Sequence, residues 1–555
     1  MRVVPRQSPT YGDLQGRNIN AVFNLVIDAS MMFRIHSFKQ AAFWSTAINA
    51  FGQVLALVFS MVMAAVFGAQ ESTDVLYYCL GIIALLSGLF QVINVSVLIP
   101  ESMRRQHQVG EADAMAFINR FFVAFGLIVF GLTAWLFMNP LQTLTAISRF
   151  SPEALARNSR LVIWLLAALP FQIMAQLLLD VLVSYKFLTL PAMLSCINRA
   201  INILFVWLFH RQLGVISMAL GLLLGLSLQI LLNMFLLRQV IHWSPFVWRT
   251  RIGGAVFRNI AWTEIGTLVS TMAGYVPLYL FSGYSAGALT ALNYARRLAA
   301  VPSQLMTTQI SNVTGIKFNE EAACHNHAGM SQSFERIQRM LIFILVPTAF
   351  ILALIAGPMI RILFGRGAFG SEAVRETVRL FSVLIMVLPL EAINNVAARI
   401  NFARQEVAFG TRWQVFGNLI YAAMIYIFVR LMGTIGFPIG TFVFYFFYLL
   451  VLAQPFSRRM APVNLWPTMK YYCLTVIAAG IPALIGWGVS RWLLLLPGHI
   501  WLQSAIPAGI YAIMFFIVLR YIPPDRLTRN RGLELVRKTT HRLKASHCSK
   551  NEIGI

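Results

Sequence analysis

The sequence predicts an all-α polytopic membrane protein with about 14 transmembrane helices. Of the 555 residues, 58% are hydrophobic and only 12% are charged, and the mean hydropathy is +0.71, which lies outside the range of soluble globular proteins. Apolar runs of ~20 residues, long enough to cross a hydrocarbon core ~30 Å thick, recur along the chain. Runs of this length indicate helices rather than the short alternating strands of a barrel.

The first part of the chain is expected to form a six-helix lobe behind a basic extension. In the extension, residues 1–40, the one apolar patch is interrupted by Asn24 and Asp28 and has no small-residue cleavage site, so we expect a cytoplasmic segment and not a cleaved signal peptide. Apolar runs between polar breaks then predict an N-lobe over residues 41–238, with spans at 41–67, 75–99, 120–138, 161–184, 190–209 and 213–237.

A second lobe of the same design is expected to follow. The stretch beginning at Val66 can be aligned with the stretch beginning at Leu280, because each is the end of one span, a short hairpin of small residues and a long span with polar interruptions. The offset is six spans, an even number, so the lobes share one topology, as in transporters built from parallel repeats. The C-lobe, residues 257–455, is expected to have spans at 257–281, 286–314, 339–359, 377–400, 411–430 and 434–455.

Two more spans, 469–490 and 500–521, and a basic tail over residues 522–555 complete the chain. With the N-terminus inside, most of the 44 Lys and Arg residues fall in cytoplasmic segments, as the positive-inside rule requires. Both termini are therefore expected in the cytoplasm, where the tail could contact anionic membrane lipids. The net charge of +24 is explained by topology, so nucleic acid is not expected as a partner.

Signatures of catalysis and of metal binding are missing from the sequence. It has no Gly-rich phosphate loop ending in Gly-Lys, no His-Glu-x-x-His motif and no nucleophile elbow, so we expect a transporter and not an enzyme. The five cysteines show no CxxC spacing, and the cluster of Cys324, His325 and His327 is expected in a solvated loop. No metal site and no cofactor are predicted.

Polar residues gather in the eighth span, which includes Asn293, Arg297, Gln304 and Thr308 on one expected helical face. An ionisable side chain at mid-bilayer costs ~2.5–3.5 kcal/mol or more unless it faces a polar cavity or a partner. Arginine supplies a permanent charge and a planar fork that matches phosphate geometry. This face, with Tyr294 nearby, therefore predicts a site for an anionic, phosphorylated ligand.

The two adjacent arginines of this span are expected to differ in role. Neighbouring helix residues point ~100° apart, so Arg296 and Arg297 cannot share one face. Arg297 lies on the polar face and is the expected ligand contact. The alternative for either residue is to snorkel to the membrane interface and anchor the helix there, and this alternative fits Arg296 better.

Four acidic residues in or at the start of spans are candidates for coupling or gating: Asp74, Asp180, Glu264 and Glu391. Each could bind Na⁺ or H⁺ as a coupling ion, or pair with an arginine such as Arg199. For Asp74, which begins the second span, a helix-capping role is the alternative.

Three stretches of the sequence carry a family resemblance. They are VFGAQESTDVLYY from Val66, NYARRLAAVPSQL from Asn293 and ILFGRGAFGSEAV from Ile362. In motif, order and spacing they resemble the MurJ/MviN lipid II flippases of the multidrug/oligosaccharidyl-lipid/polysaccharide exporter superfamily, and the resemblance covers most of the chain. Arg297 matches the cavity arginine of that family's eighth helix, and Asp74 matches its hairpin aspartate.

The resemblance implies two six-helix lobes around a central cationic cavity, with residues 469–521 forming a groove for a polyprenyl tail. It also implies alternating-access movement of an undecaprenyl-diphosphate-linked saccharide from the inner to the outer leaflet of the bacterial cytoplasmic membrane.

The chain departs from the family in its first two helices. The family's first helix usually carries a serine–arginine pair and then an arginine–aspartate pair, where this chain has Gln53, Phe59 and Ser60. The family's second helix usually ends in a double arginine, where this chain reads LLSGLFQVINVSVLIP. Neutral donors, Gln53, Gln91 and Asn94, would then assist a smaller number of arginines.

The sequence consequently leaves both the cargo and the function open. The cargo could be lipid II or another lipid-linked saccharide, such as an exopolysaccharide repeat unit. A cation-coupled exporter of small molecules from the same superfamily is an alternative function. A non-transporting scaffold for glycan-assembly enzymes is another.

Overall fold

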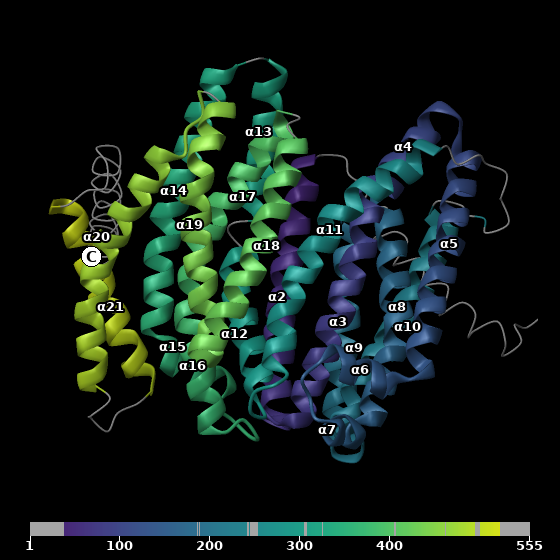
Figure 1. The fold of residues 1–555 in the computed structure, drawn as a ribbon, viewed down its shortest axis with the longest axis horizontal. Coiled ribbons are helices and arrows are strands. Elements are labelled where there is room, and N and C mark those ends of the chain that lie inside the picture. Colours follow the sequence, from purple (N-terminus) through teal and green to yellow (C-terminus); the bar gives the residue numbers. More distant parts are fainter. Residues whose placement is uncertain are drawn as a thin grey trace, which may run out of the picture. The chain divides into compact units, whose positions relative to one another are not determined.

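A computed structural model describes the chain over residues 38–185, 187, 189–240, 244, 254–304, 308–324, 326–404, 407–460, 462–493 and 500–521. The expected basic extension and basic tail lie almost wholly outside these ranges. Within them every regular element is a helix (Figure 1), which confirms the predicted fold class.

The expected spans of the N-lobe all form helices. The second span is a continuous helical rod made of α3, a π-helical turn η1 and α4, so it extends beyond its predicted end. The elements are α2 (Phe38–Phe67), α3 (Glu71–Ile93), η1 (Asn94–Leu98), α4 (Ile99–Gln108), α5 (Glu111–Met138), α6 (Pro140–Ile147), α7 (Pro152–Arg157), α8 (Ser159–Ser184), α9 (Thr189–Leu213) and α10 (Ile216–Val240).

The remaining eight expected spans also correspond to helices or to consecutive helical segments. The eighth span is divided into α12 and α13, and the tenth into α16, η3 and α17. The elements are α11 (Gly254–Phe281), α12 (Ala288–Pro302), α13 (Thr308–Ala323), α14 (His327–Leu354), α15 (Ala356–Phe364), α16 (Ser371–Leu384), η3 (Ile385–Val387), α17 (Leu388–Ala403), α18 (Val407–Met432), η4 (Gly433–Ile435), α19 (Gly436–Arg459), α20 (Trp466–Leu493) and α21 (Ile500–Tyr521).

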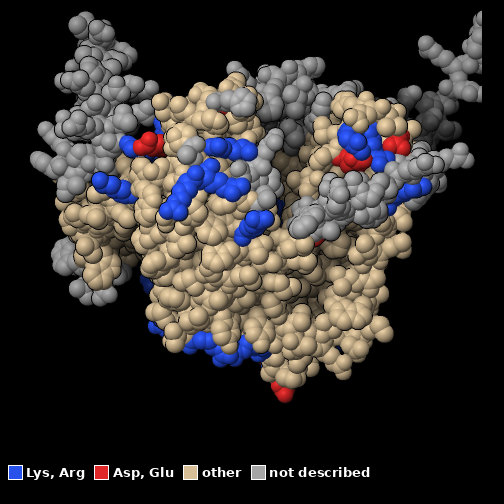
Figure 2. All heavy atoms as spheres, turned by 45° about the horizontal axis from the view of Figure 1, so that its top comes forward, with Lys and Arg blue, Asp and Glu red and all other residues tan. Residues whose placement is uncertain are grey.

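The helices have the surface of a membrane protein. Ten segments of the described residues are long and apolar enough to cross a bilayer, and one of them, Phe409–Arg459, contains both α18 and α19. Large apolar side chains such as Leu127, Leu431 and Leu484 are more than 70% exposed, which is unfavourable in water but suits lipid. On the face in Figure 2, charged side chains lie mainly in the upper part and at the lower edge, and the broad surface between them is uncharged.

Contacts divide the described chain into two compact units. The first contains α2 as far as Phe59, Cys79–Thr143 and Ala156–Leu268, and the second contains Ser60–Tyr78, Leu144–Leu155 and the helices from Val269 onward. The hairpin between α2 and α3 is therefore grouped with the second unit. The lobe boundaries expected from the sequence stay a prediction.

Each unit is organised around its most buried helices. In the first unit α8 lies between α5 and α10, and α10 also packs on α9. Small residues, Ala168 and Ala175 on α8, let α8 approach Leu226 of α10 closely. In the second unit α12 packs on α16, α17 packs on α13 and α14, and α20 packs on α14 and α21. The polar residues of interest lie on α2, α3, α8, α9 and α12.

Candidate functional site

Asp74 of α3 caps the N-terminus of α12. One carboxylate oxygen, Oδ1, accepts hydrogen bonds from the backbone N–H of Thr290 (2.8 Å) and from its hydroxyl (2.6 Å), and Oδ2 accepts from the backbone N–H of Gly287 (2.6 Å). The carboxylate is buried, with 4% of Asp74 exposed. A helix N-terminus presents N–H groups without partners and a partial positive charge, so a carboxylate is well suited to this position.

The local sequence of α12 explains why the cap comes from elsewhere. The residue that precedes α12 is Gly287, which has no side chain to accept these hydrogen bonds. Its φ of 90° favours glycine, and a Cβ at this position would lie 3.0 Å from the backbone oxygen of Ala69. Glycine therefore allows the hairpin to approach α12, and Asp74 of the hairpin replaces the missing N-cap side chain.

Aromatic contacts extend this attachment one turn along α12. The hydroxyl of Tyr77 donates to the hydroxyl of Tyr294 (3.1 Å), and the two rings meet edge to face. Tyr294 is 1% exposed and stacks on Phe364 with ring centroids 4.8 Å apart. Its side chain is thus packed among aromatic rings, although the sequence suggested a ligand contact for it. We call Asp74, Tyr77, Gly287, Thr290 and Tyr294 the hairpin latch.

The loop that follows α15 contacts the same hairpin. The backbone N–H of Ala368 donates to the backbone oxygen of Ala65 at 2.9 Å. The loop belongs to the ILFGRGAFGSEAV stretch and the hairpin to the VFGAQESTDVLYY stretch. All three stretches that carried the family resemblance therefore meet at the hairpin latch and its surroundings.

Arg297 is half-buried on α12, about one turn beyond Tyr294 and two turns beyond Thr290. Its Nη1 donates to the hydroxyl of Ser60 on α2 at 2.9 Å, and Ser60 is 1% exposed. Ser60 is one of the residues that replace the family's arginine–aspartate pair. The neutral hydroxyl orients the guanidinium through a hydrogen bond, whereas an aspartate at this position would form an ion pair with it.

Arg296 has a different partner. Its guanidinium carbon lies 5.1 Å from the ring centroid of Phe437 on α19, and Phe437 is 1% exposed. This is a cation–π contact within the second unit. The two arginines thus have separate surroundings, as their ~100° separation on the helix requires.

The rest of the expected polar face is less continuous than the sequence indicated. Asn293 is half-buried on α12, and Gln304 is exposed in a π-helical turn after it. Residues 305–307 and the side chain of Thr308 lie outside the described part of the chain. The proposal that Thr308 shares a face with Arg297 therefore stays a prediction.

A polar pocket of about 300 Å³ lies within the first unit, between α2, α8 and α9. Gln53, Asp180 and Arg199 all line it. Asp180 is 6% exposed, and its carboxylate accepts hydrogen bonds from the side-chain amides of Asn94 (2.9 Å) and Gln176 (3.1 Å). The structure thus brings together three residues that the sequence suggested separately: Gln53, Asn94 and Asp180.

The other sequence-derived candidates lie apart from these groupings. Gln91 is exposed on α3, Glu264 is half-buried on α11 and Glu391 is half-buried on α17. Their roles stay predictions. Among the described residues no group of three or more His, Cys, Asp or Glu side chains is arranged to hold a metal ion.

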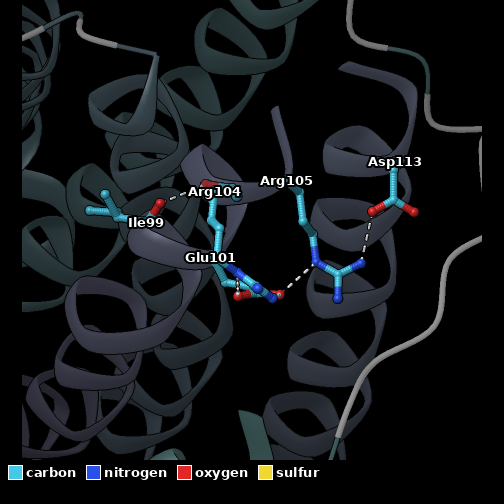
Figure 3. A network of polar contacts seen from close by, with 6 residues as sticks. Ile99, Glu101, Arg104, Arg105 and Asp113 are labelled. Atoms are coloured by element: carbon cyan, nitrogen blue, oxygen red, sulfur yellow. Dashed lines mark hydrogen bonds and ion pairs between the residues drawn. The ribbon is translucent and has the colours of Figure 1, made fainter. Parts of the chain in front are cut away.

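A pair of arginines that the sequence analysis overlooked lies at the end of the second span, on α4. Arg105 lies between Glu101 and Asp113 (Figure 3), with Nε 2.8 Å from Glu101 and Nη1 2.9 Å from Asp113. Its guanidinium also covers the ring of Phe117 at 4.8 Å. Arg104 pairs with Glu101 through two hydrogen bonds and is 58% exposed. These carboxylates neutralise the arginines and fix the α4–α5 turn.

Comparisons with known proteins agree with this arrangement. A family model described as lipid II flippase MurJ matches residues 22–503. A curated relative from Aquifex aeolicus (strain VF5), named a probable lipid II flippase MurJ, is 22% identical over 304 residues. That match covers 54% of this chain and 59% of the relative, so the chain spans about three fifths of the curated relative that it matches.

Solved structures share the fold. One described as lipid II flippase MurJ in an inward closed conformation has a TM-score of 0.71 at 18% identity, and covers 86% of this chain and 98% of its own. Another is an inward-facing multidrug resistance MATE family transporter of the MOP superfamily, with a TM-score of 0.58 at 14% identity. That match covers 76% of this chain and 100% of the transporter's chain. At these identities the likeness shows a common fold.

Proposed function

Because the chain belongs to the lipid II flippase MurJ family, we propose that it moves lipid II, a polyprenyl-diphosphate-linked saccharide, from the inner to the outer leaflet of the bacterial cytoplasmic membrane. The family match supports this function over small-molecule export and over a scaffold. The fold alone does not separate these functions, since MATE transporters share it.

The observation that carries the proposal is the setting of Arg297. It is a half-buried cation on an apolar, membrane-spanning chain, and the hydroxyl of Ser60 accepts a hydrogen bond from its guanidinium. A diphosphate offers the planar guanidinium a bidentate, charge-assisted partner. In a medium of low dielectric constant this attraction is stronger than in water. Arg297 therefore binds the diphosphate, and Ser60 holds the guanidinium in position.

Movement of the headgroup involves no covalent step. An inside-negative membrane potential favours outward transfer of an anion by ~2.3 kcal/mol per charge per 100 mV. The hairpin latch ties α3 to α12 in the conformation described here.

The proposal is tested by measuring which lipid-linked saccharide the chain prefers to flip. The purified full chain is reconstituted in proteoliposomes with fluorescent lipid II in the inner leaflet, and exposure of the label in the outer leaflet is followed by chemical quenching. We expect flipping that an excess of unlabelled lipid II inhibits and that undecaprenyl diphosphate bearing an exopolysaccharide repeat unit inhibits less. Equal or stronger inhibition by the exopolysaccharide lipid would overturn lipid II as the preferred cargo.

A further inference from the structure

We propose that the polar pocket of the first unit binds a sugar ring of the transported headgroup. The identity of the ligand rests on the proposed function, but the pocket is built wholly from residues of the first unit. It is distinct from the diphosphate contact at Arg297, which belongs to the second unit.

The size of the pocket suits a small polar ligand. Its volume of about 300 Å³ lies at the lower end of the ~300–1,000 Å³ that small-molecule sites occupy. This space accommodates a sugar ring but not a complete lipid-linked headgroup. The polar side chains that line it are Asn49, Gln53, Gln176, Asp180, Ser195 and Arg199.

The charges of the lining favour a neutral ligand. Asp180 is the one acidic residue and Arg199 the one basic residue among the lining residues, so their formal charges cancel. A phosphate would be attracted by the guanidinium but repelled by the carboxylate, and a metal cation the reverse, so neither ion gains a net attraction from the two charges. The amides and the hydroxyl both donate and accept hydrogen bonds, which is what a polyhydroxylated ring needs.

Hydrogen bonds to neutral groups hold both charged side chains in place. The guanidinium of Arg199 donates to the backbone oxygen of Gly52, where a Cβ would lie 3.4 Å from Nη1 and 3.3 Å from the sulfur of Cys196. Asn94 and Gln176 each donate to one oxygen of Asp180. An ionised carboxylate has about four acceptor positions, so these two bonds leave acceptors for ligand hydroxyls.

The backbone of the second span supports the same assignment. Asn94 begins the π-helical turn η1, is 1% exposed and directs its amide to Asp180. Its Oδ1 is buried and has no hydrogen-bond partner among the described residues. A π-turn inside an α-helix is rare and is frequently retained at functional sites. The irregular turn thus places Asn94 where it orients the carboxylate of the pocket.

The test uses the full chain in lipid nanodiscs and saturation-transfer-difference NMR, which detects weak binding. The probe is the saccharide headgroup of lipid II, freed of its lipid and diphosphate. Asn49→Leu removes a polar group at the pocket, and Ala192→Phe fills it, since Ala192 also lines it. Ala200→Phe is the matched control, because Ala200 is exposed on the same helix and does not line the pocket.

We expect saturation transfer to the ring protons with the unmodified chain and with Ala200→Phe. In Asn49→Leu and Ala192→Phe the signal should fall about fivefold or more, as loss of hydrogen bonds and of space requires. Each variant must elute as the same monodisperse species. Absence of signal from the unmodified chain, or its survival in both pocket variants, would overturn the proposal.

Two further results separate this inference from the proposed function. Saccharide binding that depends on Asn49 and Ala192, without flipping of lipid II, supports the pocket and rejects the proposed function. Flipping without any saccharide signal supports the proposed function and rejects the pocket. If inorganic diphosphate binds instead, with the same sensitivity to the two substitutions, the pocket is an anion site and the inference is wrong.

Discussion

Thr290 donates two hydrogen bonds to the carboxylate of Asp74, a residue that lies 216 positions earlier in the chain. The first comes from the backbone at the start of α12 and the second from the side chain, so the attachment depends on both the fold and the residue type. It joins the α2–α3 hairpin to α12, the helix that carries Arg296 and Arg297. The position of Arg297 relative to Ser60 follows from this attachment, because Ser60 lies on the helix that enters the hairpin.

Asp74→Asn should destabilise the chain. The amide has one oxygen where the carboxylate has two, so it cannot satisfy the three donors of Gly287 and Thr290. Loss of a charge-assisted, buried hydrogen bond costs ~1–3 kcal/mol, and the thermal unfolding midpoint in detergent should fall. Glu372→Gln is the control, because the Glu372 side chain is 91% exposed. Equal midpoints for Asp74→Asn and the unmodified chain would contradict the capping role.

Tyr77→Phe and Tyr294→Phe should show coupled effects on stability. Each removes one hydroxyl of the Tyr77–Tyr294 hydrogen bond and keeps the ring contacts. In a double-mutant cycle on the free energy of unfolding, the coupling energy should be ~0.5–1.5 kcal/mol. Additive effects would mean that the two hydroxyls do not interact.

Arg105→Ala should be far more destabilising than Arg104→Ala. Arg105 is 9% exposed, and its removal takes one guanidinium from both Glu101 and Asp113, which costs ~1–3 kcal/mol for a largely buried, charge-assisted hydrogen bond. Arg104 is 58% exposed, and an ion pair in contact with solvent contributes little to stability. Chemical denaturation of the two variants measures the difference. Similar losses would show that the cluster in Figure 3 does not depend on the buried guanidinium.

Arg296→Leu should reduce stability and leave cargo preference unchanged. The substitution removes the cation over Phe437, a contact of ~0.5–2 kcal/mol. Competition between lipid II and another lipid-linked saccharide in the flipping assay measures the preference. A changed preference with unchanged stability would place Arg296 in the ligand site instead.

The helices could be predicted from the sequence because hydropathy is a local property. Each apolar run became a helix, and the hairpin at Val66 and the polar eighth span were both recognisable. A capping role for Asp74 was also suggested, but periodicity cannot show which helix a side chain caps. The partner, Thr290, becomes visible only when segments far apart in the chain are brought together.

The candidate sites were harder to predict because their residues come from segments that lie far apart in the sequence. Gln53, Asn94 and Asp180 come from three different spans, and nothing in their spacing shows that Gln53 and Asp180 line one pocket or that Asn94 donates a hydrogen bond to Asp180. The π-helical turn at Ser303 and Gln304 also interrupts the regular helical period on which the expected polar face of Arg297 and Gln304 depended. The double arginine was overlooked because it lies beyond the last apolar residue of the second span.

The most direct test of the account is the rate at which Arg297→Ala flips fluorescent lipid II in proteoliposomes. Truncation of a buried charge that pairs with the ligand costs ~2–5 kcal/mol, so the rate should fall by about thirtyfold or more. Arg297→Lys should recover only part of it, because lysine lacks the bidentate fork. Arg375→Ala, at an arginine whose side chain is 79% exposed, is the control and should flip at the unmodified rate. Flipping by Arg297→Ala at the unmodified rate would contradict the assignment of Arg297 as the diphosphate contact.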